Sequence, residues 1–238
     1  MNFFGHAAVA SWLHPPPVGA IAFGAMLPDL TSIAGTALPD ADAAVRLGIE
    51  LHHRTDAAFH RLAEFSALAR QLGERLIQLG CRRGPARGAA HVGVELLLDG
   101  TLIAEAPARA AYQDALAWDR AGLVWQRDGD AERFAVFHRR WVDGGIPDDL
   151  RDHQAVVRRV TRTLSRRPLL APDHRDRAII AAGLDEIAPR VARAAPALVV
   201  PGGARSTLGG SRTCAGSFGG PMAVRRSGMA MYSVFLTL

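Results

Sequence analysis

The chain has 238 residues, of which 49% are apolar and 21% charged, ordinary proportions for a globular protein with a substantial core. All 28 basic residues are arginine, and the formal net charge is +5. Four of these arginines and no acidic residue fall in residues 200–238, so subtracting their charges leaves about +1 for residues 1–199. A body this close to neutral offers no obvious concentrated basic face in its sequence, and we therefore expect no binding to nucleic acid.

Cysteine usage and hydropathy favour a cytoplasmic protein. Cys81 and Cys214 lie far apart and form no CxxC spacing, so a disulfide framework is not expected. The first residues lack the positively charged start of a signal peptide. The longest apolar run, residues 18–27, is about half as long as a membrane-spanning helix requires. We expect a cytoplasmic protein without a membrane span.

Apolar residues recur at helical spacing along most of the chain, and alternating strand patterns are nearly absent. The sequence predicts helices over residues 2–13, 18–27, 41–62, 64–79, 87–102, 106–123, 130–142, 148–164 and 173–194. Pro28 should end the second helix, Asp40 should cap the third, and Gly80 should stop the fourth. The fold class is therefore all-α, a single-domain bundle of about seven to nine helices.

Two segments differ from the others in composition. Residues 87–102 are apolar nearly all round the predicted helix, so we expect this helix in the middle of the bundle. Residues 200–238 are rich in glycine and arginine and show no periodicity. We interpret them as a disordered tail without function, attached to a domain of residues 1–199.

The most unusual segment is GIELHHRTDAAFH, residues 48–60. His52, Asp56 and His60 follow one another at intervals of four, and His53 precedes Asp56 by three, so these groups share one face of a helix. A metal site is the simplest reason to place imidazoles and a carboxylate where apolar side chains would be expected. One helix cannot complete such a site, so other segments must supply ligands.

Three other segments offer those ligands. His91, Glu95 and Asp99 repeat the same spacing on the predicted central helix, while His6 and Asp29 belong to the first two helices. Facing helices that each carry inward histidines and carboxylates are a common way for bundles to hold metals. Mixed imidazole and carboxylate ligands suit Mn, Fe or Zn better than Ca.

Each of these residues also has an ordinary structural interpretation. His6 could be a packed histidine, Asp29 a turn cap, and Asp99 a residue at a helix end, while His60 could support the site indirectly or lie on the surface. The pairs His52–Asp56 and His91–Glu95 are harder to explain in that way, because charged groups on apolar helices are costly to bury without partners.

Four short blocks resemble, in order and spacing, the acyl carrier protein phosphodiesterases, which are relatives of the HD-type metal phosphohydrolases. The blocks are Met1-Asn2-Phe3-Phe4-Gly5-His6, Gly24-Ala25-Met26-Leu27-Pro28-Asp29-Leu30, Gly48-Ile49-Glu50-Leu51-His52-His53-Arg54-Thr55-Asp56 and Ser165-Arg166-Arg167-Pro168. The resemblance covers roughly residues 1–170 but is concentrated in these blocks. The family's D-x-x-x-D-H segment is replaced here by His91-Val92-Gly93-Val94-Glu95-Leu96, and the first arginine of its H-R-R segment by His53.

The resemblance implies an HD-like bundle that hydrolyses the phosphodiester joining 4′-phosphopantetheine to acyl carrier protein. It implies a divalent metal, Mn²⁺ first and Mg²⁺, Fe²⁺ or Zn²⁺ as alternatives, bound by His52, Asp56 and Asp29. His6, His91 and Glu95 would complete the ligand sphere or move protons, and Arg54 would balance the phosphate charge.

Two other functions remain open from the sequence. The chain could be a different metal-dependent phosphohydrolase, acting on a small phosphorylated metabolite or a lipid head group. It could also be a helical protein that binds metal without catalysis.

Overall fold

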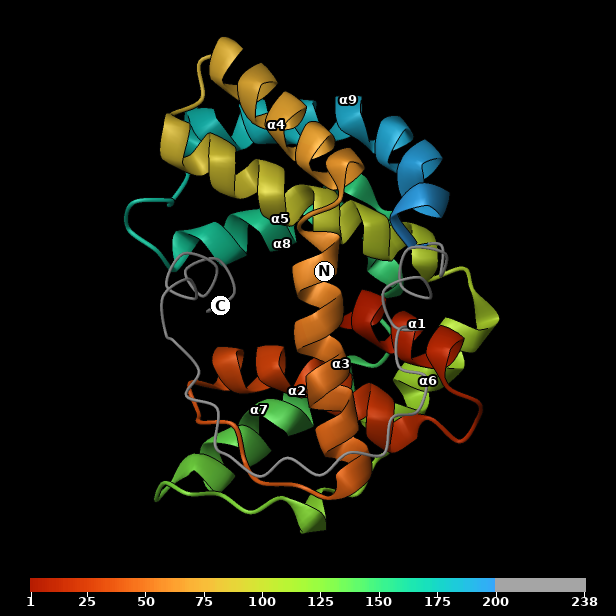
Figure 1. Ribbon diagram of the computed structural model, residues 1–238. Coiled ribbons are helices and arrows are strands. Elements are labelled where there is room, and N and C mark those ends of the chain that lie inside the picture. Colours follow the sequence, from red (N-terminus) through yellow and green to blue (C-terminus); the bar gives the residue numbers. More distant parts are fainter. Residues whose placement is uncertain (200–238) are drawn as a thin grey trace, which may run out of the picture.

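The computed structural model describes residues 1–199, which form nine α-helices and two short 3₁₀ helices (Figure 1). The α-helices are α1 (Phe3–Leu13), α2 (Gly19–Ala34), α3 (Ala43–Phe59), α4 (Ala63–Gln78), α5 (Arg83–Leu102), α6 (Ala106–Leu116), α7 (Asp130–Gly144), α8 (His153–Ser165) and α9 (His174–Val199). The 3₁₀ helices are η1 (Arg120–Gly122) and η2 (Asp148–Arg151). The all-α prediction is confirmed for residues 1–199, where one isolated bridge between Asp40 and Val124 is the only β pairing. The predicted tail, residues 200–238, lies outside the described residues.

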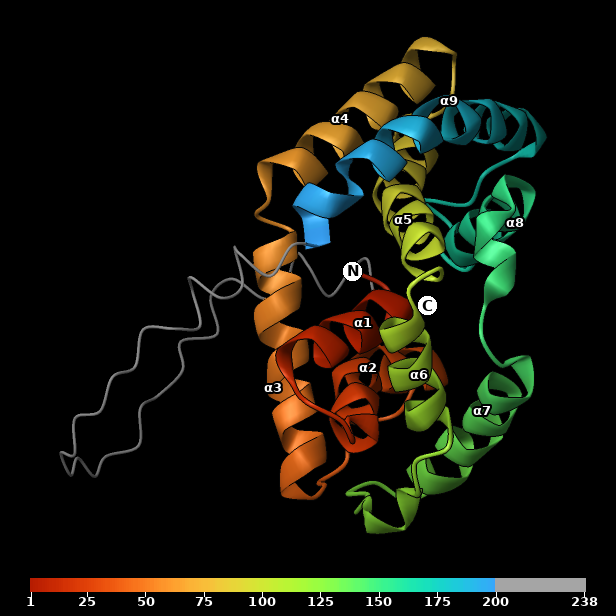
Figure 2. The same cartoon turned by 90° about the vertical axis from the view of Figure 1, so that its right-hand side faces the viewer.

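The helices pack in two groups that meet near the start of the chain (Figure 2). In one group α2 packs on α3, and α1 and α6 pack on each other and on α2. In the other group α5 packs on α4, α8 and α9. Contacts of α1 with α5 join the two groups. The predicted central place of the fifth helix is confirmed, since α5 is buried along most of its length.

The prediction that Pro28 ends the second helix is wrong, because α2 continues to Ala34. Pro28 lacks the N–H group that would bond to the preceding turn, so the helix loses one backbone hydrogen bond there. Leu27 and Leu30 are fully buried, and their burial outweighs this loss. The Thr31 hydroxyl donates to the carbonyl of Leu27 at 3.0 Å. The helix ends only at Gly35, whose φ of 69° suits the left-handed conformation of a C-cap.

Other helix ends also differ from the prediction for local reasons. Asp42, not Asp40, caps α3 by accepting a hydrogen bond from the Val45 amide at 2.9 Å. The predicted helix 106–123 ends at Leu116 and is followed by the separate η1. In the same way, η2 precedes α8, which begins after the capping residue Asp152. Within residues 1–199, no helix is both long and apolar enough to cross a bilayer.

The crossing of α2 and α3 depends on two glycines. A Cβ atom at Gly24 would lie 2.2 Å from the carbonyl oxygen of Val45, and one at Gly48 would lie 2.2 Å from that of Ile21. Both distances are far below van der Waals contact, so any larger residue would force the helices apart. The crossing therefore brings the two backbones into direct contact, one helical turn before His52.

Candidate metal centre

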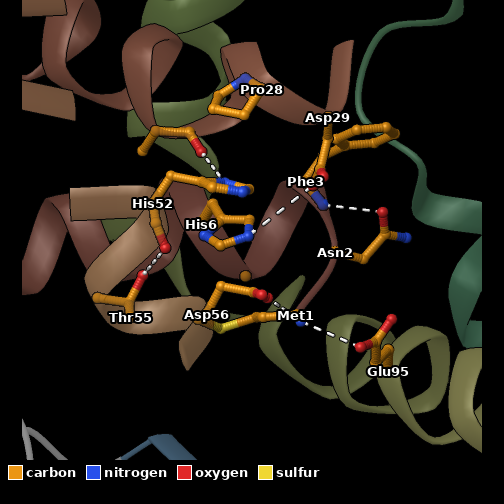
Figure 3. Close-up of polar contacts among 12 residues, drawn as sticks. Met1, Asn2, Phe3, His6, Pro28, Asp29, His52, Thr55, Asp56 and Glu95 are labelled. Atoms are coloured by element: carbon orange, nitrogen blue, oxygen red, sulfur yellow. Dashed lines mark hydrogen bonds and ion pairs between the residues drawn. The ribbon is translucent and has the colours of Figure 1, made fainter. Parts of the chain in front are cut away.

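The predicted ligands converge where α1, α2, α3 and α5 meet (Figure 3). His6 comes from α1, Asp29 from α2, His52 and Asp56 from α3, and Glu95 from α5. The structure describes two groups of side chains there that could each hold a metal ion. We call them the inner cluster (His6, Asp29, His52) and the outer cluster (His60, His91, Glu95).

The inner cluster is almost completely buried, with exposed fractions of 1% for His6, 4% for Asp29 and 4% for His52. His6 lies between the other two side chains (Figure 3), with its ring centre 4.2 Å from that of His52. Its Nε2 atom is 3.8 Å from Oδ2 of Asp29. This separation is too long for a hydrogen bond. It fits two ligands of one ion, since bonds of about 2.1 Å allow ligand atoms up to about 4.2 Å apart.

A backbone hydrogen bond fixes the orientation of His52. Its Nδ1 atom lies 2.9 Å from the carbonyl oxygen of Ala25, which can only accept, so Nδ1 carries the proton. Nε2 then keeps its lone pair, as in most histidines that bind metals. Burial lowers the pKa of His52 to about 4, so its imidazole is neutral at pH 7. The close crossing at Gly24 and Gly48 places the Ala25 carbonyl within reach.

Three polar atoms of the inner cluster have no hydrogen-bond partner within residues 1–199: both ring nitrogens of His6 and Oδ2 of Asp29. Burial holds the pKa of His6 well below its usual value. It holds the pKa of Asp29 well above its usual value. Buried polar atoms without partners are costly and uncommon. A bound cation would satisfy atoms of both residues, so the donor set fits a divalent metal.

The outer cluster is organised around Glu95. His91 Nε2 lies 3.3 Å from Oε1 of Glu95, and His60 Nε2 lies 3.5 Å from the same oxygen. The two imidazole rings are stacked, with centres 4.8 Å apart. His60 Nε2 is also 3.2 Å from Oδ1 of Asp56, so Asp56 adjoins this cluster.

The amino group of Met1 joins the two carboxylates of this region (Figure 3). It donates to Oδ1 of Asp56 and to Oε1 of Glu95, each at 3.1 Å. Although burial alone would raise the pKa of Glu95, this ammonium and His91 lower it to about 2. Burial would also raise the pKa of Asp56, but His60 and the ammonium hold it well below its usual range. Both carboxylates are therefore ionised at neutral pH and attract cations.

The predicted site residues do not form one ligand sphere. His6, Asp29 and His52 belong to the inner cluster, whereas His91 and Glu95 belong to the outer cluster, with Asp56 beside it. The structure includes His60 in the outer cluster, although its sequence position left it open as a surface residue. No side-chain spacing pattern could have pointed to the amino group of Met1.

Two further candidate residues, Arg54 and Asp99, lie outside both clusters. Arg54 is exposed on α3 and makes no hydrogen bond or ion pair with the rest of residues 1–199, so nothing ties it to either cluster. Asp99 lies in the last turn of α5, which agrees with its interpretation as a residue at a helix end, and it is 1% exposed. Its Oδ1 accepts a hydrogen bond from the Gly5 amide at 3.1 Å, which fixes α1 against α5. Burial raises the pKa of Asp99 to about 7.

Comparison with known proteins adds no family assignment: neither a family model, nor a curated protein, nor a solved structure matches this chain. The chemistry of the site must therefore be argued from its own residues.

Proposed function

We propose that the chain is a cytoplasmic, HD-like, metal-dependent phosphodiesterase, with holo acyl carrier protein as the substrate implied by its sequence blocks. The inner cluster carries this proposal. Three potential ligands from three helices are buried together, two of them have polar atoms without hydrogen-bond partners in the described chain, and the third has its tautomer fixed for ligation. A structural role alone gives no reason to bury such atoms unsatisfied.

His6, Asp29 and His52 would hold the metal, with Mn²⁺ the first choice and Mg²⁺, Fe²⁺ or Zn²⁺ as alternatives. A divalent ion lowers the pKa of a bound water and polarises a phosphoryl group. The outer cluster would supply the acid–base groups. Glu95 and Asp56 are ionised, and each lies within 3.5 Å of His60 Nε2, so they can orient this imidazole and stabilise it when it accepts a proton.

The test is incubation of holo acyl carrier protein with the purified chain and Mn²⁺, followed by mass spectrometry of the carrier protein. We expect loss of the phosphopantetheine mass, and no loss with His52→Ala. Intact carrier protein together with hydrolysis of a general diester such as bis(p-nitrophenyl) phosphate would reject the named substrate. That result would favour a phosphohydrolase acting on a small metabolite or a lipid head group.

A metal-binding or structural protein without catalysis is the second candidate, and the contacts of Met1 favour it. Its ammonium contacts both Asp56 and Glu95 and offsets one of their two negative charges without any metal, so the outer cluster depends less on a bound cation than the inner cluster does. Metal analysis of the purified protein separates the candidates. Absence of bound transition metal, with unchanged stability after His52→Ala, would reject both enzymatic functions.

A further inference from the structure

A cleft of about 850 Å³ opens beside Glu95, between α5, α7, α8 and the end of α2. Its volume is within the range of small-molecule sites, about 300–1,000 Å³. Apolar side chains of α2, α5 and α7 form one part of its lining: Ile33, Ala34, Val92, Leu96, Val136 and Phe137. The cleft thus combines an apolar wall with direct access to one carboxylate of the outer cluster.

The charged part of the lining is mainly basic, with Glu95 and Glu132 as its acidic residues. Five arginines contribute to it: Arg133 and Arg140 from α7, and Arg159, Arg162 and Arg166 from α8. Two of them have acidic partners, because Arg133 pairs with Asp130 and Arg159 pairs with Asp149 at 2.7 Å. For Arg140, Arg162 and Arg166 the structure shows no hydrogen bond or ion pair with any residue between 1 and 199. Three guanidinium groups at this cleft are thus left to bind a ligand.

The helix ends explain only part of this arrangement. Arg162 and Arg166 lie in or just after the last turn of α8, where the helix dipole favours positive charge. They are also four residues apart on one face of α8, where like charges repel. The dipole of α8 does not account for Arg140, which reaches the same cleft from α7. An anion in the cleft would relieve the repulsion among all three.

We propose that this cleft binds a small amphiphilic phosphate compound. Arg140, Arg162 and Arg166 hold its anionic group, and its apolar body lies along Val92, Phe137 and their neighbours. Guanidinium groups suit phosphate, because their paired N–H groups match its oxygens. The proposal rests on the proposed function in one respect: a phosphate ester bound beside Glu95 would be a substrate only if the clusters catalyse phosphate-ester hydrolysis.

The test measures binding without turnover, by titration calorimetry in EDTA with octyl phosphate below its micelle concentration. We expect octyl phosphate to bind. Inorganic phosphate lacks the alkyl chain and 1-octanol lacks the anionic group, so each should bind at least about tenfold more weakly. The double variant Arg140→Gln/Arg162→Gln should weaken octyl phosphate binding by at least about tenfold. The control Arg70→Gln, an exposed arginine on α4, should leave it unchanged.

Three results would overturn the proposal. Equal affinity for octanol and octyl phosphate would mean that the arginines are not used. An equal loss in Arg70→Gln would indicate a general effect of net charge. If octyl phosphate does not bind, but holo acyl carrier protein does so through Arg140 and Arg162, the cleft serves an acidic protein and not a small molecule. Because the titration needs no metal and no hydrolysis, a failure of the phosphodiesterase assay leaves its outcome unaffected.

Discussion

Replacing Gly48 by alanine tests whether the crossing of α2 and α3 builds the inner cluster. The new Cβ would lie 2.2 Å from the carbonyl oxygen of Ile21 and 2.7 Å from the amide nitrogen of Ala25. Non-bonded heavy atoms prefer about 3.5 Å or more, so the helices must separate by roughly 1 Å. Overpacking of this kind costs about 1–3 kcal/mol, against a gain of about 1 kcal/mol from the better helix propensity of alanine.

We expect Gly48→Ala to destabilise the protein by about 2 kcal/mol, because backbone atoms cannot move aside as a flexible side chain can. Urea unfolding gives this value. The separation should also break the hydrogen bond of His52 to the Ala25 carbonyl, so Mn²⁺ affinity should fall with stability. Gly144→Ala is the matched control, since a Cβ there meets nothing within 4 Å. A Gly48→Ala protein with the stability and metal affinity of the wild type would show that the helix crossing does not position the inner cluster.

Three further outcomes follow from the clusters and from the ion pair between exposed Arg82 and buried Asp176. His52→Ala should lower Mn²⁺ affinity by at least about tenfold in competition with a fluorescent indicator, whereas His53→Ala, an exposed neighbour, should not change it. EDTA should lower the melting temperature of the metal-loaded protein, because a ligand at 100 times its Kd adds about 2.7 kcal/mol to the native state; an unchanged melting temperature would contradict metal binding. Although burial opposes the shift, hydrogen bonds from Arg82 lower the pKa of Asp176 from 3.8 to about 2. A lowered carboxyl pKa stabilises the folded state by about 2 kcal/mol above pH 4. This stabilisation is lost as the pH falls toward 2. Asp176→Asn should therefore be less stable than wild type at pH 7 in urea unfolding, with a difference that shrinks below pH 4.

The helices could be predicted because their apolar spacing is regular, but their ends depend on contacts that spacing does not encode. Pro28 has the local chemistry of a helix end, yet burial of Leu30 outweighs one missing backbone hydrogen bond. Asp40 and Asp42 are equally good caps by residue type. Asp40 is instead paired through its backbone with Val124, a residue far along the chain.

The candidate ligands could be found from spacing, because intervals of four place side chains on one helical face. Their division into two clusters could not be predicted from spacing. It depends on the angles at which α1, α2, α3 and α5 cross, and on the side of α3 from which each partner approaches. Asp56 follows His52 by one turn, yet it pairs with His60, while the ring of His52 packs on that of His6.

The structure also divides the sequence blocks by physical role. Gly24 and Gly48 are required by the contact between α2 and α3. Asp29 and His52 belong to the same two blocks, but the helix contact does not require them. They instead have the atoms that could bind a metal. A bundle that kept only the crossing would still preserve the glycine of each block. The resemblance to the phosphodiesterases therefore carries functional weight only through His6, Asp29, His52 and Asp56. A metal bound by the first three would distinguish a metal-binding bundle from an inert bundle with the same helical crossing.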